Sequence, residues 1–176
     1  MACNKIDSGR LKACIDVTGG IRKAWIANFE DVASYTVDGV TNKVTAINME
    51  SASPVPVFYE YNFTKTTGEM NSALTKDIKN GSAGYTQTLK LRFNKNEQEL
   101  FDQVQTLVQN ECAILVEDMN GQYWVAGELN GMDATEGATA FGIELNDFNG
   151  VDVTWTGIEK ANFREILDLA VITAVI

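Results

Sequence analysis

The strongest periodic pattern of apolar positions lies in the middle of the chain. Apolar and polar side chains alternate through Tyr85–Phe93, which is typical of a half-buried β-strand. Asn96, followed three residues later by Glu99, then indicates a helix N-cap with a carboxylate that reaches back. The next apolar residues recur at helical spacing and are Leu100, Phe101, Val104, Leu107 and Val108. The pattern therefore predicts a strand followed by an amphipathic helix over Glu97–Gln109 that covers a core.

Paired strand patterns around short turns predict β-hairpins. Asn120-Gly121 lies between two such patterns and is the dipeptide that best satisfies a type I′ turn. The three predicted hairpins join Cys112–Val116 to Tyr123–Leu129, Ser34–Val37 to Val40–Ile47, and Thr139–Leu145 to Val151–Thr156. Further strands are expected at Ile21–Phe29 and Val57–Thr64. The predicted fold class is mainly β with one principal α-helix, in an antiparallel β-sandwich or barrel.

The segment Thr64–Gly84 separates two predicted strands by roughly twenty residues, which is longer than most connections in compact domains. Within it, Met70, Leu74 and Ile78 recur at every fourth residue and predict one face of a short helix. Such a face needs an apolar surface to pack against. Either this face packs on a neighbouring subunit, as we predict, or it folds back onto its own sheet.

The two ends of the sequence differ in character. Residues 1–20 are polar and glycine-containing, and we expect a terminal arm there, followed by a single domain over 21–176. The last segment, Ala170–Ile176, is rich in β-branched residues and predicts a terminal strand. An apolar edge of this kind must be covered by its own sheet or by another subunit. Its candidate interface residues are Val171, Ile172, Val175 and Ile176.

Charge and cysteine content narrow the class of protein. The 176 residues include 24 acidic and 14 basic side chains, for a net charge of −10, and a chain so acidic repels a phosphate backbone at long range. Simple solubility is the alternative explanation for this acidity. Cys3, Cys14 and Cys112 form no short pair and are expected to be reduced, with Cys112 in the core. The N-terminal residues contain no continuous apolar segment, so we expect synthesis in the cytosol without a signal peptide.

No catalytic, cofactor-binding or metal-binding residues are predicted. The chain contains no histidine, which excludes the common Ser-His and Cys-His nucleophile pairs. Asp118 and Asn120 resemble the start of a calcium loop, but Tyr123 occupies the position that requires glycine. The adjacent carboxylates Glu117 and Asp118 are expected to be solvated beside a turn. The three tryptophans lie on separate predicted strands, which favours core packing over base stacking. They are Trp25, Trp124 and Trp155.

The order of the predicted elements resembles the tail tube fold of tailed bacteriophages: an otherwise antiparallel β domain with one strand–helix–strand unit and one long connection. The opening MACNKIDSGRLKACIDVTGGIRKAWIANFEDV and the closing DVTWTGIEKANFREI are similar to structural proteins of phages that infect Bacteroidetes, crAss-like phages included. In that family, strands with one flanking helix form rings, and the rings stack around a channel for DNA. The resemblance implies that Thr64–Gly84 reaches a neighbouring subunit or ring.

The resemblance implies a virion structural protein, made in the host bacterial cytoplasm and incorporated into the phage tail. Its expected partners are copies of itself, in six-fold or twelve-fold rings, and neighbouring tail proteins. DNA is expected to contact it only while passing through the acidic channel, and no membrane partner is expected. Such rings occur in a tail tube or a tail barrel, and a head-tail adaptor or completion protein is an alternative. A small ligand-binding soluble β-barrel, or an enzyme that uses carboxylates, is the alternative from a different class.

Overall fold

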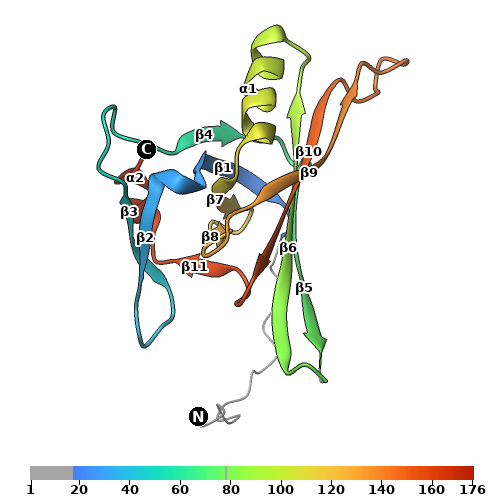
Figure 1. Cartoon of the computed structure of the whole chain (residues 1–176). Coiled ribbons are helices and arrows are strands. Elements are labelled where there is room, and N and C mark those ends of the chain that lie inside the picture. The colour runs from blue at the N-terminus through green and yellow to red at the C-terminus, as the bar shows by residue number, and fades with distance from the viewer. Residues whose placement is uncertain (1–17, 78) are drawn as a thin grey trace.

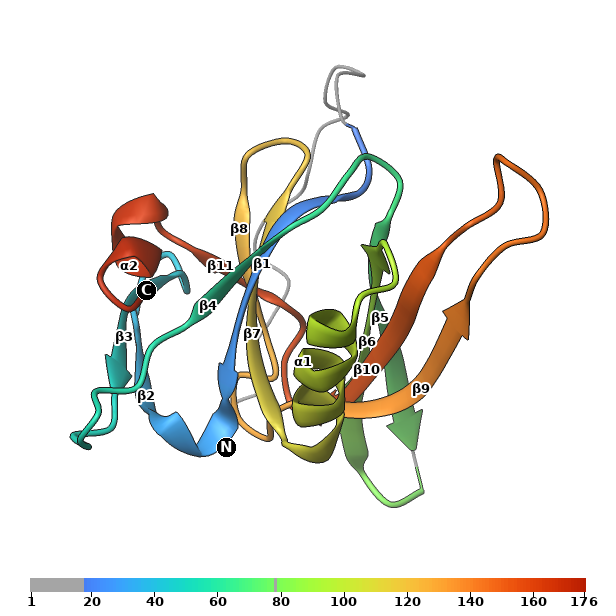
Figure 2. The same cartoon turned by 90° about the horizontal axis from the view of Figure 1, so that it is seen from above.

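The structure is a computed structural model that describes residues 18–77 and 79–176. Cys3, Cys14, Ile78 and most of the predicted N-terminal arm therefore lie outside the described residues. The described chain forms two β-sheets, one α-helix of three turns and one short C-terminal helix (Figures 1 and 2). The strands are β1 (Ile21–Asn28), β2 (Val32–Val37), β3 (Val44–Met49), β4 (Tyr59–Asn62), β5 (Gly68–Asp77), β6 (Ser82–Asn94), β7 (Cys112–Asp118), β8 (Tyr123–Ala126), β9 (Asp133–Ala140), β10 (Gly150–Glu159) and β11 (Arg164–Ile166). The helices are α1 (Gln98–Gln109) and α2 (Leu169–Thr173), and a 3-10 turn spans Phe29–Asp31.

The large sheet has the strand order β2-β3-β11-β8-β7-β1-β4, and the small sheet has the order β5-β6-β10-β9. Paired strands run antiparallel except β3 and β11, which are parallel. Neither sheet closes on itself, because β2 and β4 remain edges of one sheet and β5 and β9 remain edges of the other. The mainly β prediction is confirmed, whereas the barrel alternative within it is wrong.

Two cores share the central strands β1 and β7. Alternate side chains of a strand point to opposite faces, and here both faces are buried. Ala24 and Ile26 enter the first core, which lies between the two sheets and includes Trp155. Trp25 and Ala27 enter the second core, which the large sheet and α2 enclose. In Figure 2 the β2–β3 hairpin stands apart from β1, β7 and β8, so the large sheet bends around this second core.

The helix α1 confirms the principal helix of the sequence prediction. Its apolar stripe packs against the first core through Leu100, Phe101, Val104 and Leu107. The predicted cap is wrong, because the helix begins at Gln98 with Glu97 at the N-cap and no side-chain hydrogen bond caps it. The Asn96 Nδ2 instead donates to the carbonyl of Ala140, 2.7 Å away, and so ties the helix entry to β9.

The segment predicted as a long loop with a helical face is instead a β-hairpin. All ten residues of β5 pair with β6, from Gly68 opposite Leu91 to Asp77 opposite Ser82. Residues four apart lie on the same face of a strand, whose side chains repeat every two residues, and nearly on the same face of a helix, which turns once every 3.6 residues. Met70 and Leu74 therefore share a face in either structure. The helix prediction was wrong because β-pairing to the long strand β6 decides between the two.

The predicted C-terminal strand is also wrong. Residues Leu169–Thr173 form α2, and the Asp168 side chain caps it by accepting a hydrogen bond from the Ala170 N–H at 2.8 Å. The chain then returns toward the sheet edge, where the Phe58 N–H donates to the carbonyl of Val175. A capping aspartate and three apolar side chains facing the second core therefore outweigh the β preference of this run.

The three predicted hairpins are present with different turns. Gly121 has a φ of 77°, but Asn120 does not have the positive φ that a type I′ turn requires at both positions. The Gly121 N–H donates to the Asp118 carbonyl, and the Asp118 side chain accepts from the Asn120 and Gln122 N–H groups. In the second hairpin β3 begins at Val44 rather than at Val40, which leaves residues 38–43 as a loop. The predicted strand Thr139–Leu145 is mostly wrong, because only Thr139 and Ala140 belong to β9 and residues 141–149 form a loop.

Candidate assembly surface

The small sheet extends into a hairpin at each end. Strands β6 and β10 pair from Gly150 opposite Asn94 to Glu159 opposite Tyr85, so the loop 141–149 lies beyond one end of this ladder. The β5–β6 turn lies beyond the other end. Figure 1 shows the two turns projecting from opposite ends of the molecule. Thirteen residues of β6 at roughly 3.3 Å each separate them by about 40 Å.

The loop 141–149, here called the tip loop, exposes three large apolar side chains. Leu145 is 100% exposed, Ile143 is 98% exposed and Phe141 is 69% exposed. Single exposed apolar residues are common, but three within five residues on a projecting loop indicate a contact surface. Each of these side chains would contribute about 1.5–3 kcal/mol if a partner buried it fully.

The tip loop is ordered by its own polar contacts. The Asp147 carboxylate accepts hydrogen bonds from the N–H groups of Ile143 and Glu144, both at 2.9 Å. These backbone hydrogen bonds, first that from Glu144 and then that from Ile143, lower the pKa of Asp147. Gly142 supplies the positive φ of 68° that the bend needs. The apolar side chains are thus held outward by a preformed loop, which reduces the ordering cost of binding.

The base of the tip loop is anchored to the small sheet. The Arg92 guanidinium lies 4.2 Å from the centre of the Phe148 ring, a cation–π contact. Arg92 also donates to both oxygens of Asp152, at 2.7 and 3.0 Å. These contacts fix Phe148 on the outer face of the small sheet and leave only the outermost part of the loop free to meet a partner.

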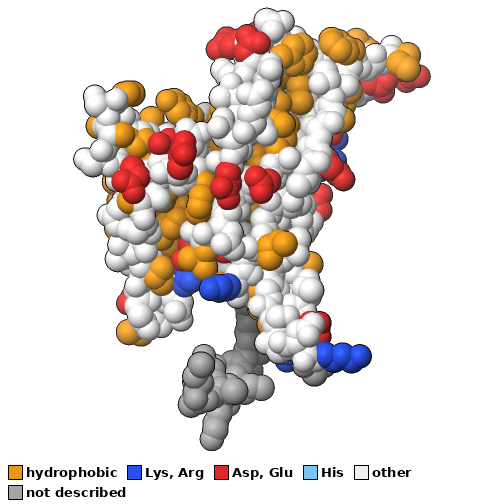
Figure 3. All heavy atoms as spheres, viewed as in Figure 1, with side chains coloured by type: hydrophobic (Ala, Val, Ile, Leu, Met, Phe, Trp, Pro, Cys, Tyr) orange, Lys and Arg blue, Asp and Glu red, His pale blue; other side chains and the backbone are white. Residues whose placement is uncertain are grey.

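At the other end, residues 74–77 and 79–85 form what we call the projecting hairpin. Strand β10 ends opposite Tyr85, so the pairs Thr75–Gly84, Lys76–Ala83 and Asp77–Ser82 have no third strand beside them. Leu74 is 61% exposed at the start of this projection. Within the part of the chain that the structure describes, neither Lys76 nor Lys79 takes part in an ion pair. Figure 3 shows basic side chains at this lower end and acidic side chains at the tip loop.

The structure separates the predicted interface residues into three groups. Met70 is half-buried and packs against the first core, while Leu74 faces solvent. Val171, Ile172 and Val175 are buried in the second core, so the chain itself covers most of its apolar terminus, and Ile176 is partly exposed. Ile78 lies outside the described residues. The sequence prediction missed the tip loop, because Phe141, Ile143 and Leu145 alternate as strand residues do, and alternation alone does not reveal that no second sheet faces them.

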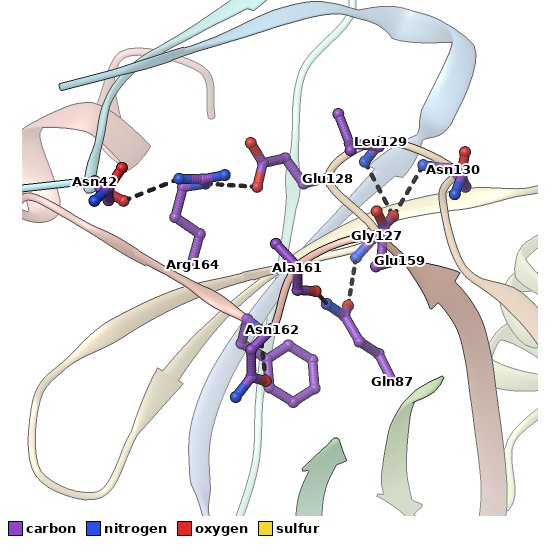
Figure 4. A network of polar contacts seen from close by, with 11 residues as sticks. Asn42, Gln87, Gly127, Glu128, Leu129, Asn130, Glu159, Ala161, Asn162 and Arg164 are labelled. Atoms are coloured by element: carbon purple, nitrogen blue, oxygen red, sulfur yellow. Dashed lines mark hydrogen bonds and ion pairs between the residues drawn. The ribbon is translucent and has the colours of Figure 1, made fainter. Parts of the chain in front are cut away.

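A buried polar network joins the two sheets (Figure 4). The Gln87 side chain accepts from the Gly127 N–H at 3.1 Å and donates to the Ala161 carbonyl at 3.3 Å. Glu159 accepts from the N–H groups of Leu129 and Asn130 at 3.0 and 2.9 Å. These contacts satisfy backbone groups of the connection after β8 and the carbonyl of Ala161, which follows β10. The network is therefore structural and offers no free group for chemistry.

Glu117 and Asp118 do not form the solvated pair that the sequence predicted. Glu117 is buried and accepts a hydrogen bond from Arg22 at 3.0 Å, while Asp118 organises the turn and accepts from the Trp124 indole at 3.2 Å. Both carboxylates are thus committed to structural contacts. Among residues 18–77 and 79–176, no group of three or more potential ligands from His, Cys, Asp and Glu is placed to hold a metal ion.

An open hollow of about 270 Å³ lies beside β11. Its lining includes Lys43, Glu165 and Arg164. Lys43 pairs with Glu165 at 2.6 Å, and Arg164 pairs with Glu128 at 2.7 Å. The charged groups of the hollow therefore neutralise one another, and nothing in it points to a particular ligand.

No helix in the described ranges has the length and apolar character needed to cross a membrane. Compared with known proteins, the chain matches no family model and no curated protein sequence.

Proposed function

We propose that this protein is a virion structural protein whose copies form homo-oligomeric rings of a phage tail, six-fold or twelve-fold, around the DNA channel. The observation that carries the proposal is the small sheet, which projects beyond both ends of the core and exposes apolar side chains at Leu74, Ile143 and Leu145. A protein that acts alone gains nothing from apolar side chains held outward on rigid projections. The resemblance of the sequence to phage tail proteins supplies the tail as the setting.

The sheet edges also support assembly. Strand β5 is an edge of ten residues, and β9 is an edge of eight residues at the other side of the same sheet. Unpaired edges of this length invite pairing with another chain. Copies arranged around a ring bring the β5 edge of one subunit toward the β9 edge of the next, which provides a lateral contact in addition to the axial projections.

The proposed channel is acidic. The chain has a net charge of −10, and a negative wall repels phosphate groups, so DNA slides along it without binding. This part of the proposal requires a substantial share of the 24 acidic residues to face the channel. Duplex DNA mixed with the assembled protein at low salt should show no retention in a gel-shift assay. Rings with a strongly basic lumen would contradict it.

Assembly is tested on the purified full-length protein by sedimentation velocity and negative-stain electron microscopy. Rings with a central opening are the expected result. A persistent monomer at all concentrations up to the millimolar range would overturn the proposal and favour a small ligand-binding protein. Tube and adaptor roles differ in a second observable, because a tube protein stacks its rings into long assemblies and an adaptor stops at a single ring.

A further inference from the structure

We propose that the tip loop of one copy docks onto the projecting hairpin of a second copy, head to tail. The inference rests on the proposed function in one respect, since it names the axial contact between successive rings. It has a separate structural basis in the two ends of the small sheet. The partner is a second copy of this chain, because the two surfaces are complementary in charge and both expose apolar side chains.

The charges of the two ends are opposite. The tip loop contains Glu144 and Asp147 and no basic residue, for a charge of −2. The projecting hairpin contains Lys76 and Lys79 against the single acidic residue Asp77, for a charge of +1. Asp77 accepts hydrogen bonds from the N–H groups of Lys79 and Asn80, as Asp147 does from those of Ile143 and Glu144. Figure 3 shows acidic side chains at the tip loop, and basic side chains beside an acidic one at the lower end. A chain with a net charge of −10 repels its own copies overall, so a local pairing of opposite charges selects this contact over others.

Each end also carries apolar surface beside its charges. Ile143 and Leu145 flank Glu144 on the tip loop, and Leu74 lies two residues before Lys76 on β5. Leu74 and Lys76 lie on the same face of β5, and Tyr85 is paired with Leu74 across the hairpin. This face therefore presents an apolar surface next to the ammonium group of Lys76. An apolar centre bordered by charge is the usual composition of a specific protein interface.

The geometry of this contact makes it open-ended. The two surfaces belong to opposite ends of the same β6–β10 ladder, so one copy cannot use its own tip loop to cover its own projecting hairpin. A contact between two different patches is heterologous and repeats without closing when successive copies are stacked along an axis. Rings joined in this way form a tube whose axial contacts come from the small sheet of every subunit.

The test uses the full-length protein and two variants that each destroy one end. Leu145→Asp places a charge in the centre of the tip loop, and Leu74→Asp does the same on the projecting hairpin. Each variant alone should raise the concentration needed for end-to-end association at least tenfold. When the two are mixed, the intact tip loops of the Leu74→Asp protein can still meet the intact hairpins of the Leu145→Asp protein. The mixture should therefore form pairs of rings that do not grow further.

A charge exchange provides a second test that does not depend on apolar residues. Glu144→Lys and the double change Lys76→Glu with Lys79→Glu should each weaken association at least tenfold. The protein that carries all three changes should recover part of it, because the lysine introduced at position 144 then faces the carboxylates introduced at positions 76 and 79. Val40→Asp is the control, since Val40 is 88% exposed on the unrelated β2–β3 loop, and this change should leave association unaltered. Circular dichroism and thermal unfolding establish that each variant folds.

The outcomes separate the two proposals. Rings that stack equally well in the parent and in the tip-loop variants would overturn the docking contact and leave the ring proposal intact. Linear chains without a central opening that the same variants abolish would support the docking contact and overturn the ring. Absence of recovery in both the mixture and the charge exchange would overturn the docking contact.

Discussion

Gln87 on β6 accepts a hydrogen bond from the Gly127 N–H at 3.1 Å, and this bond links the small sheet to the end of β8 in the large sheet. Gln87 is 2% exposed, so water cannot replace the contact. Gln87→Leu should leave the Gly127 N–H and the Ala161 carbonyl unpaired and lower the free energy of unfolding by about 1–3 kcal/mol.

Chemical denaturation of Gln87→Leu, followed by tryptophan fluorescence, measures this loss. Gln105→Leu is the matched control, because Gln105 is exposed on α1 and the same substitution there removes no hydrogen bond within the described structure. Equal stability of the two variants would show that the buried bond does not hold the sheets together.

The close approach of β10 to the connection after β8 gives a second prediction. A Cβ atom on Gly157 would lie 2.6 Å from the Gly131 carbonyl oxygen and 2.7 Å from the Met132 sulfur. Gly157→Ala should therefore push this connection away from β10 and destabilise the protein by about 1–3 kcal/mol. Gly39→Ala has nothing within 4 Å and should be nearly neutral. Thermal unfolding of both variants is the measurement, and a Gly157→Ala protein as stable as the Gly39→Ala protein would refute the packing argument.

The buried thiol of Cys112 gives a prediction about pH. Burial, the largest cause, raises the pKa of Cys112 from 9.0 to about 11. At pH 8, in a Cys3→Ser, Cys14→Ser background, a chromogenic disulfide reagent should react with the native thiol at least roughly a hundredfold more slowly than with the unfolded chain. Because the folded pKa is the higher one, the thiol's contribution to stability is full below pH 9 and declines as the pH rises toward 11. Rapid native labelling at pH 8 would contradict the buried position.

The sequence predicted correctly where local pattern and tertiary packing agree. The stripe of Leu100, Phe101, Val104 and Leu107 has one period and one core to face, and α1 forms there. The run Tyr85–Phe93 likewise lies within β6, because its alternate residues Leu89, Leu91 and Phe93 are buried. In both cases the apolar residues alone determine the element and the face that it buries.

The sequence-based predictions were wrong where contacts with another segment of the chain determine the secondary structure. Strand β5 carries polar residues at most positions, and only its pairing with β6 makes it a strand. In the same way, Val171 and Ile172 have strand preferences but form a helical turn, because Asp168 caps it and the second core accepts both side chains. The exposure of Ile143 and Leu145 had no signal in the sequence, since it depends on where the opposite sheet ends.

The projecting hairpin gives the last prediction, which concerns reach. Deleting Thr75, Lys76, Ala83 and Gly84 removes two complete cross-strand pairs and shortens the projection by about 7 Å, while the turn between Asp77 and Ser82 and the alternation of faces remain. Because Met70 and the part of β5 beside the core are untouched, the shortened protein should unfold at nearly the parent temperature and should still form rings. It should lose stacking, since neither the projection nor Lys76 then reaches the next ring. Electron microscopy of the parent and the shortened protein at equal concentration makes the comparison. If the shortened protein stacks as readily as the parent, the hairpin is not an arm between subunits.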